Sequence, residues 1–237
     1  MTRDRVRTGS PELDGLLDGG LEPGSITQFY GEPATGKSTF CVLAAVAVLR
    51  SGRFVAYIDT EGFSIERFRQ IAGDDAEQLA ERLFLYEPTD FDSQGVMIAG
   101  SEKVLSGHDT GLFIVDSATL LYRTQLEKGR DAMQKLIKQM VYLLGLAKRH
   151  NIPAIITNQV YVDTVRGTYM PLGGTALGHI SKTIVRIDRL DGLRRAVLVK
   201  HRSRPSGLSF EFEIVKEGIR AVNTADSNEM TVPHGQR

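Results

Sequence analysis

One stretch near the start of the chain decides the fold: Gly31-Glu32-Pro33-Ala34-Thr35-Gly36-Lys37-Ser38. It matches the phosphate-binding loop pattern G-x-x-x-x-G-K-[ST] at every fixed position. Residues 25–30, which precede it, read as a buried strand, and residues 39–50, which follow it, read as an apolar helix. Strand–loop–helix is the context that confirms this motif, so it is favoured over a glycine-rich turn that happens to carry Lys-Ser.

The residue types in this loop suit the binding of a nucleoside triphosphate. Glycines allow backbone N–H groups to curve around an anion, and the start of the helix adds partial positive charge. Lys37 can reach the β- and γ-phosphates, and the Ser38 hydroxyl can ligate Mg²⁺. We therefore expect nucleotide contacts from Gly31, Glu32, Pro33, Ala34, Thr35, Gly36, Lys37, Ser38 and Thr39.

The composition is that of an ordinary globular protein, with 237 residues, 41% hydrophobic residues and zero formal net charge. The single cysteine, Cys41, rules out an intramolecular disulfide framework. A charged N-terminus and the lack of a long apolar run predict a cytoplasmic protein. The charge is unevenly placed, because residues 59–92 are acidic and residues 182–204 are basic. The basic segment indicates either a local basic face or a solvated strand surface.

Strands and helices alternate along the chain and are followed by hairpins. The apolar pattern predicts strands at 53–58, 83–86, 112–116 and 153–158, and helices at 64–72, 75–82, 93–105 and 130–150. Turn signals predict hairpins from 183–190 with 194–201 and from 208–215 with 219–222. We expect one α/β domain over residues 1–222, with a mostly parallel core sheet and antiparallel C-terminal hairpins, and a disordered polar tail over 223–237. Residues 160–178 lack apolar periodicity and are predicted to form a mobile loop.

Polar side chains end three of the predicted strands. Glu61 lies just past the second strand, Asp116 closes a run of four apolar residues, and Gln159 follows the strand at 153–158. Ligands of open α/β sheets bind at this edge, so the three side chains should converge there. We expect Asp116 to hold Mg²⁺, Glu61 to activate the attacking water, and Gln159 to sense the γ-phosphate and pass its presence to the following loop. The alternative is that these are ordinary strand-end polar residues.

Together these motifs resemble the RecA/RadA recombinase family, and most closely a short archaeal branch of it. The resemblance covers about residues 8–222 and adds further motifs to the phosphate loop: Thr8-Gly9-Ser10, Leu13-Asp14-Gly15-Leu16-Leu17, Gly19-Gly20, Tyr57-Ile58-Asp59-Thr60-Glu61-Gly62-Phe63, Glu66-Arg67, Phe113-Ile114-Val115-Asp116-Ser117, Thr157-Asn158-Gln159-Val160 and Gly173-Gly174. It implies a RecA-like nucleotide-binding core that uses ATP and Mg²⁺, with Glu61, Lys37 and Gln159 in the catalytic roles.

The resemblance also assigns residues to partners of the nucleotide. Arg67 matches an arginine that stacks on adenine, and the alternative is a plain charge on a helix surface. Lys200 and Arg202 resemble basic residues that reach a neighbouring subunit's nucleotide, and the alternative is a basic strand end. Residues 121–132 and 160–174 match two DNA-binding loops. These loops supply six expected DNA contacts: Arg123, Lys128, Arg130, Tyr161, Arg166 and Tyr169. Basic and aromatic side chains together are what single-strand binding requires, although loop tyrosines often serve only in packing.

The resemblance implies an accessory protein of homologous recombination and DNA repair that binds ATP and DNA and hydrolyses ATP weakly. The chain starts at the nucleotide-binding core of this family. We therefore expect no helix–hairpin–helix domain, no polymerisation segment, and little or no strand exchange. The implied partners are single-stranded or branched DNA, the recombinase RadA or a Holliday-junction resolvase, and other copies of the chain. One alternative is a KaiC-like ATPase that switches protein partners without a DNA role. A small-molecule kinase is disfavoured because no lid-like Arg-rich segment is present.

Overall fold

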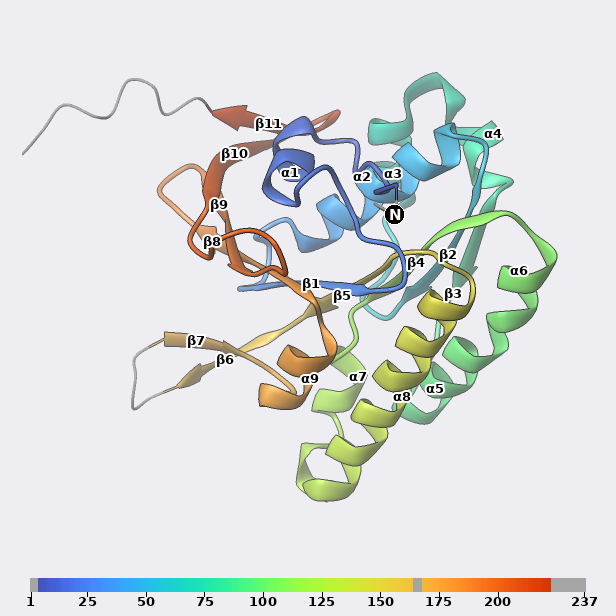
Figure 1. The fold of residues 1–237 in the computed structure, drawn as a ribbon, viewed down its shortest axis with the longest axis vertical. Helices are drawn as coiled ribbons and strands as arrows, with labels where there is room; N and C mark the ends of the chain where they lie inside the picture. Colours follow the sequence, from blue (N-terminus) through green and yellow to red (C-terminus); the bar gives the residue numbers. More distant parts are fainter. Residues whose placement is uncertain (1–3, 164–167, 223–237) are drawn as a thin grey trace, which may run out of the picture.

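The strand that leads into the phosphate loop lies in the middle of a nine-stranded sheet (Figure 1). The computed structural model describes residues 4–163 and 168–222. The sheet is built from β1 (Ile26–Gly31), β2 (Phe54–Asp59), β3 (Leu83–Tyr86), β4 (Thr110–Asp116), β5 (Ala154–Asn158), β8 (Thr183–Arg189), β9 (Arg194–Lys200), β10 (Ser209–Val215) and β11 (Gly218–Val222). Its order is β11-β10-β9-β8-β1-β5-β4-β2-β3.

The sheet is parallel from β8 to β3 and antiparallel from β8 to β11. Strand β1 pairs with β5 on one side and β8 on the other, in the registers Tyr30↔Asn158 and Tyr30↔Arg186. Residues of β1, β4 and β5 are buried throughout, as expected of parallel strands covered on both faces. The predicted fold class, a parallel core with antiparallel C-terminal strands, is therefore confirmed.

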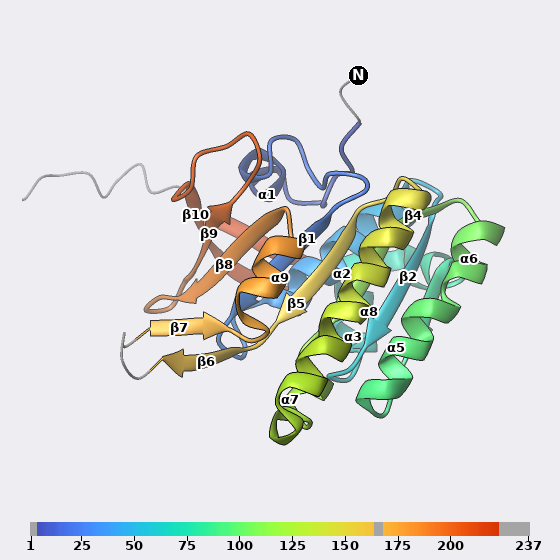
Figure 2. The ribbon, with the colours of Figure 1, turned by 60° about the horizontal axis from the view of Figure 1, so that its bottom comes forward.

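Helices cover both faces of this sheet (Figure 2). One face packs against α1 (Pro11–Leu16), α2 (Lys37–Arg50), α3 (Ile65–Ala72) and α4 (Ala76–Ala80). The other face packs against α5 (Phe91–Gly100), α6 (Glu102–Gly107), α7 (Leu120–Arg123), α8 (Arg130–Arg149) and α9 (Gly174–Ile180). Two 3₁₀ turns, Gly73–Asp75 and Leu126–Lys128, complete the described helices. The two buried apolar layers hold the sheet rigid beneath the phosphate loop.

Two local predictions were wrong. Residues 160–178 are not an irregular loop: they contain the antiparallel hairpin of β6 (Val160–Asp163) and β7 (Thr168–Pro171), followed by α9. The helix predicted over 93–105 is two helices, α5 and α6, which meet at Ser101. Residues 121–132, the first predicted DNA-binding loop, contain part of α7 and a 3₁₀ turn and run into α8. The expected tail, 223–237, lies outside the described residues.

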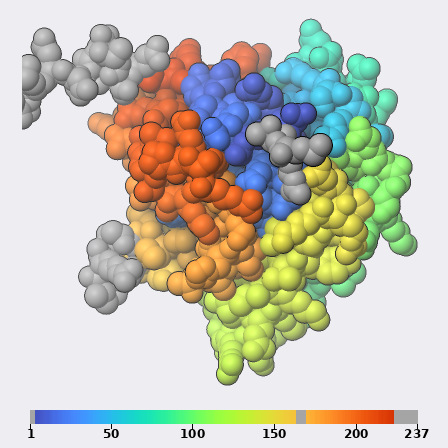
Figure 3. All heavy atoms as spheres, viewed as in Figure 1, coloured from blue at the N-terminus to red at the C-terminus, as the bar shows by residue number. Residues whose placement is uncertain are grey.

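The N-terminal segment lies against the antiparallel strands. In the space-filling view it lies beside β9 and β10, which are orange and red (Figure 3). A short bridge pairs Val6 with Leu21, and the Ser10 hydroxyl caps α1 by accepting a hydrogen bond from the Leu13 amide. Within the described part of the chain, no helix has both the length and the apolar character needed to cross a bilayer.

Candidate nucleotide-binding site

The phosphate loop adopts a conformation that requires glycine at two positions. A side chain at Gly31 would lie 2.2 Å from the Ile187 carbonyl oxygen, so β8 leaves no room for one. Gly36, at the start of α2, has a φ of 103°, in the left-handed region. It provides no side-chain cap, so the first amides of α2 remain available to an anion. The loop therefore has the shape and polarity of a phosphate cradle.

Lys37 lies across this loop. Its Nζ donates hydrogen bonds to the carbonyl oxygens of Gly31, at 3.0 Å, and Glu32, at 2.9 Å. Burial lowers the pKa of Lys37, and the nearby carboxylates of Glu61 and Asp116 oppose that shift. A buried ammonium group without a fully paired counter-charge is well suited to neutralise phosphate oxygens.

A cavity of about 460 Å³ lies above the loop and brings the expected catalytic groups together. Glu61 and Gln159 line it beside Lys37 and Ser38. The Gln159 side-chain amide donates a hydrogen bond to Glu61 Oε1 at 3.1 Å, which links the ends of β5 and β2. The predicted convergence of Glu61 and Gln159 at one edge of the sheet is therefore confirmed.

Asp116 lies deeper, where two hydroxyl groups orient it. Tyr57 donates a hydrogen bond to Oδ2 at 2.9 Å, and Thr157 donates one to Oδ1 at 2.5 Å. Burial and the adjacent Asp116 raise the pKa of the Tyr57 hydroxyl well above its usual range, so it remains a donor. Ser38 and Asp116 line a smaller cavity of about 90 Å³. A hydroxyl and an oriented carboxylate are oxygen donors of the kind that Mg²⁺ takes together with phosphates, so these residues fit the ion.

The segment after β5 is tied to the segment after β4. The Thr119 hydroxyl donates a hydrogen bond to Asn158 Oδ1 at 2.8 Å and accepts one from the backbone N–H of Gln159 at 3.0 Å. The backbone amide of Leu172 donates to the Gln159 carbonyl at 2.9 Å, which closes the base of the β6–β7 hairpin. A change in the position of Gln159 would therefore be transmitted directly to that hairpin.

The expected DNA-binding residues occupy two segments at the same edge of the sheet. Arg123 lies in α7 and lines the nucleotide cavity, whereas Lys128, on the 3₁₀ turn, and Arg130, at the start of α8, are exposed. The hairpin carries Tyr161 and Tyr169, which are 49% and 47% exposed. The two segments project from the ends of adjacent parallel strands, β4 and β5 (Figures 1 and 2). Arg166 lies outside the described residues.

The two tyrosines point to opposite faces of the hairpin. Tyr161 pairs with Met170, and Tyr169 pairs with Val162, at successive positions of the ladder. A hydrogen bond with Glu32 of the phosphate loop raises the pKa of the Tyr169 hydroxyl. The face of the hairpin that carries Tyr169 therefore contacts the phosphate loop, and the face that carries Tyr161 is directed away from it.

Arg67 makes contacts that the sequence did not predict. Its two terminal nitrogens donate to carbonyl oxygens in the β10–β11 turn: Val215 at 2.7 Å, Lys216 at 3.1 Å and Gly218 at 2.7 Å. Burial lowers the pKa of this guanidinium. Arg67 therefore has a structural role within the chain, because it joins α3 to the β10–β11 turn.

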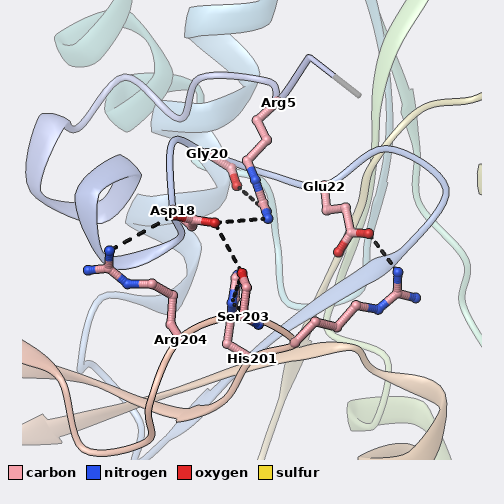
Figure 4. Close-up of polar contacts among 8 residues, drawn as sticks. Arg5, Asp18, Gly20, Glu22, His201, Ser203 and Arg204 are labelled. Atoms are coloured by element: carbon pink, nitrogen blue, oxygen red, sulfur yellow. Dashed lines mark hydrogen bonds and ion pairs between the residues drawn. The ribbon is translucent and has the colours of Figure 1, made fainter. Parts of the chain in front are cut away.

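The basic residues expected to act on a neighbour are held within the chain. Lys200 Nζ donates to the carbonyl oxygens of Gly178 at 2.6 Å and Ser181 at 2.9 Å. Arg202 pairs with Glu22 at 2.7 Å. The surrounding cluster joins Arg5, Asp18, His201, Ser203 and Arg204 (Figure 4). In the basic segment 182–204, four of the eight basic residues form ion pairs: Arg186, Arg195, Arg202 and Arg204.

Sequence reasoning missed several residues of the site. Arg194 and Ile214, from β9 and β10, line the nucleotide cavity, and Tyr57 and Thr157 orient Asp116. Thr157 could have been found, because it immediately precedes the polar end of a predicted strand. Arg194 gives no such signal, since its position depends on how the C-terminal hairpins pack beside the phosphate loop.

Known proteins resemble this chain along nearly its whole length. A family model described as Rad51 matches residues 3–222. The DNA repair and recombination protein RadB of Methanoculleus marisnigri is 59% identical over 94% of this chain and 100% of its own length. Its counterparts from Archaeoglobus fulgidus and Thermococcus kodakarensis are 43% and 42% identical, each over 92% of this chain and 99% of the relative. A crystal structure of the RadB recombinase, 40% identical, superposes with a TM-score of 0.79 and covers 92% of this chain and 99% of its own. The chain therefore belongs to the Rad51 family, in its RadB branch.

Proposed function

We propose that the protein is an ATP-binding and DNA-binding accessory factor of homologous recombination and DNA repair. One observation carries this proposal: Lys37, Glu61 and Gln159 line a single cavity of about 460 Å³ from which a hairpin with exposed tyrosines extends. The relatives named for DNA repair and recombination support the biological setting. The proposed partners are DNA, the recombinase RadA or a Holliday-junction resolvase, and further copies of the chain.

In this proposal the chain's own groups bind and orient the reactants. The loop amides and Lys37 hold the β- and γ-phosphates, and Ser38 and Asp116 hold Mg²⁺, which neutralises charge between these phosphates. Glu61 positions the attacking water and accepts its proton. Gln159, hydrogen-bonded to Glu61, changes partners when a γ-phosphate is present and shifts the hairpin that starts beside it. Hydrolysis is proposed to be weak and regulatory, with little or no strand exchange.

The nucleotide assignment is tested with Lys37→Ala. Removing the ammonium group should weaken ATP binding by roughly tenfold or more, because a charged hydrogen-bond donor to phosphate is lost. Titration with a fluorescent ATP analogue measures this, and Lys103→Ala, on the remote helix α6, is the matched control. Unchanged ATP affinity in Lys37→Ala would refute the site.

The DNA assignment is tested by titrating labelled single-stranded DNA with and without ATP across a salt series. A few phosphate contacts should give a decrease in log affinity with log salt whose slope reflects their number. Stronger binding in ATP than in ADP is expected if Gln159 couples the cavity to the hairpin. Absence of binding at low salt would instead favour the KaiC-like alternative, a nucleotide-driven switch of protein partners.

A further inference from the structure

Four arginines in or just beyond the antiparallel strands are paired with carboxylates. Nitrogen–oxygen distances in these pairs run from 2.5 to 2.8 Å: Arg186 with Asp188, Arg195 with Glu211, Arg202 with Glu22, and Arg220 with Glu213. Arg194, at the start of β9, is different. Its side chain makes no hydrogen bond or ion pair within the described residues, and its Nε is buried without a partner.

This unpaired arginine faces the phosphate loop. Arg194 lines the same cavity as Gly36, Lys37 and Ile214. Ile214 of β10 packs directly on the phosphate loop: a Cβ atom placed at Gly36 would lie 3.1 Å from Ile214 Cδ1. Arg189, which pairs with Arg194 in the ladder, also reaches the loop and donates to the Pro33 carbonyl at 3.4 Å. The contacts of Ile214 and Arg189 with the loop therefore hold the start of β9 beside the nucleotide cavity.

A guanidinium group that is partly removed from water needs an anionic partner, because burying it unpaired is costly. Arg194 lies beside a loop built for phosphate, and the planar guanidinium matches phosphate oxygens in a two-point geometry. Resting on the nucleotide site proposed above, we propose that Arg194 binds the phosphate groups of the nucleotide held by its own chain.

The other basic residues of the region support a contribution from within the chain. Lys200 and Arg202 are engaged by Gly178, Ser181 and Glu22 and do not line the cavity. The cations of this chain that line the cavity in the described residues are Lys37, Arg123 and Arg194.

The experiment compares Arg194→Gln with Arg195→Gln. Adjacent strand residues point to opposite faces, and Arg195 is paired with Glu211 on β10, so the second variant removes a neighbouring charge away from the cavity. Affinities for ATP, ADP and adenosine are measured at several protein concentrations. We expect Arg194→Gln to weaken ATP binding by roughly tenfold or more, adenosine binding to change little, and Arg195→Gln to bind ATP within about twofold of the parent. The affinities should not vary with protein concentration.

Arg194→Lys keeps a charge and should recover part of the lost ATP affinity; thermal unfolding without nucleotide checks that each variant is folded. Unchanged ATP affinity in Arg194→Gln would overturn the assignment. An equal loss for ATP and adenosine would do so as well, since the arginine would then be packing on the nucleoside. Lys37→Ala distinguishes a failure of the nucleotide site from a failure of the role of Arg194. If neither Lys37→Ala nor Arg194→Gln changes ATP affinity, the proposed nucleotide site is wrong. If only Lys37→Ala weakens ATP binding, the site stands and the role of Arg194 is wrong.

Discussion

At the scale of single residues, Asp59 is the acid whose environment most affects stability. It is 5% exposed at the end of β2 and accepts the Gly62 amide at 2.7 Å. Burial raises its pKa to about 6, and the hydrogen bond from Gly62 opposes that shift. A raised carboxyl pKa means that the fold favours the protonated form. Its contribution to stability is therefore complete below its ordinary value of about 4 and is lost as the pH rises through 6.

Asp59→Asn should remove this dependence while keeping an oxygen to accept the Gly62 amide. Between pH 4 and pH 7 the parent should lose about 1–3 kcal/mol of unfolding free energy relative to the variant. Urea unfolding at a series of pH values, without nucleotide, measures the difference. Asp74→Asn, at an exposed position, serves as the control. Parallel pH curves for the parent and Asp59→Asn would show that Asp59 is not the source.

Arg67 provides a second test at this scale. Its contacts to Val215, Lys216 and Gly218 predict a structural contribution that does not depend on adenine. Arg67→Gln should lower the unfolding free energy by about 1–3 kcal/mol, because three carbonyl groups, two of them in partly buried hydrogen bonds, lose a charged donor. Arg69→Gln, exposed on the same helix, should have little effect. If Arg67→Gln weakened ATP binding but left denaturant unfolding unchanged, stacking on the base would be its main role.

At the scale of elements, the β6–β7 hairpin divides its two tyrosines between two tasks. Tyr169 is hydrogen-bonded to Glu32 in the phosphate loop, whereas Tyr161 occupies the opposite face. Aromatic side chains on such an arm offer stacking surfaces to unpaired bases. In the proposed function, the face with Tyr161 would contact DNA and the face with Tyr169 would respond to the nucleotide.

We expect Tyr161→Ala to weaken single-stranded DNA binding by roughly fivefold or more, with or without ATP. Tyr169→Phe should leave DNA affinity without nucleotide unchanged and should alter the difference between ATP and ADP. Tyr142→Ala is the control, because Tyr142 is 41% exposed on the distant helix α8. Equal effects of Tyr161→Ala and Tyr142→Ala would contradict a stacking role for the hairpin.

Elements with strong apolar patterns could be predicted from the sequence, and those with short alternations could not. The predicted strands at 112–116 and 153–158 each contain a short apolar run, and the structure places β4 and β5 there. The β6 and β7 strands have only four residues each, so their pairing depends on the Gln159–Leu172 closure and not on local pattern. Arg67 and its carbonyl partners are about 150 positions apart, which no local pattern encodes.

At the scale of the whole molecule, the N-terminal segment restrains the strand end that carries Arg202. Glu22 pairs with Arg202, and Asp18 contacts Ser203 and Arg204. In an isolated chain this arginine is therefore already neutralised. A role at a neighbour's nucleotide would require the ion pair with Glu22 to open.

Arg202→Gln should accordingly leave the ATP affinity of dilute protein unchanged. If copies associate on DNA, the same variant should lower ATP turnover only at the concentrations where association occurs. Sedimentation and turnover measured over one concentration series test both statements, with Arg220→Gln as a control on the edge strand. Weaker ATP binding by dilute Arg202→Gln would show that the arginine acts on the nucleotide of its own chain.

The sheet order has a consequence for the synthesis of the protein on the ribosome. Strand β1 is complete by residue 31, yet its two neighbours are β5 and β8, which end at residues 158 and 189. Chains grow at about 5–20 residues per second, and contacts between distant segments form late. The strands that flank the phosphate loop are therefore synthesised roughly ten seconds or longer after the loop itself. A nascent chain cannot hold nucleotide until most of its length has emerged. Nucleotide capture would then mark the completion of folding.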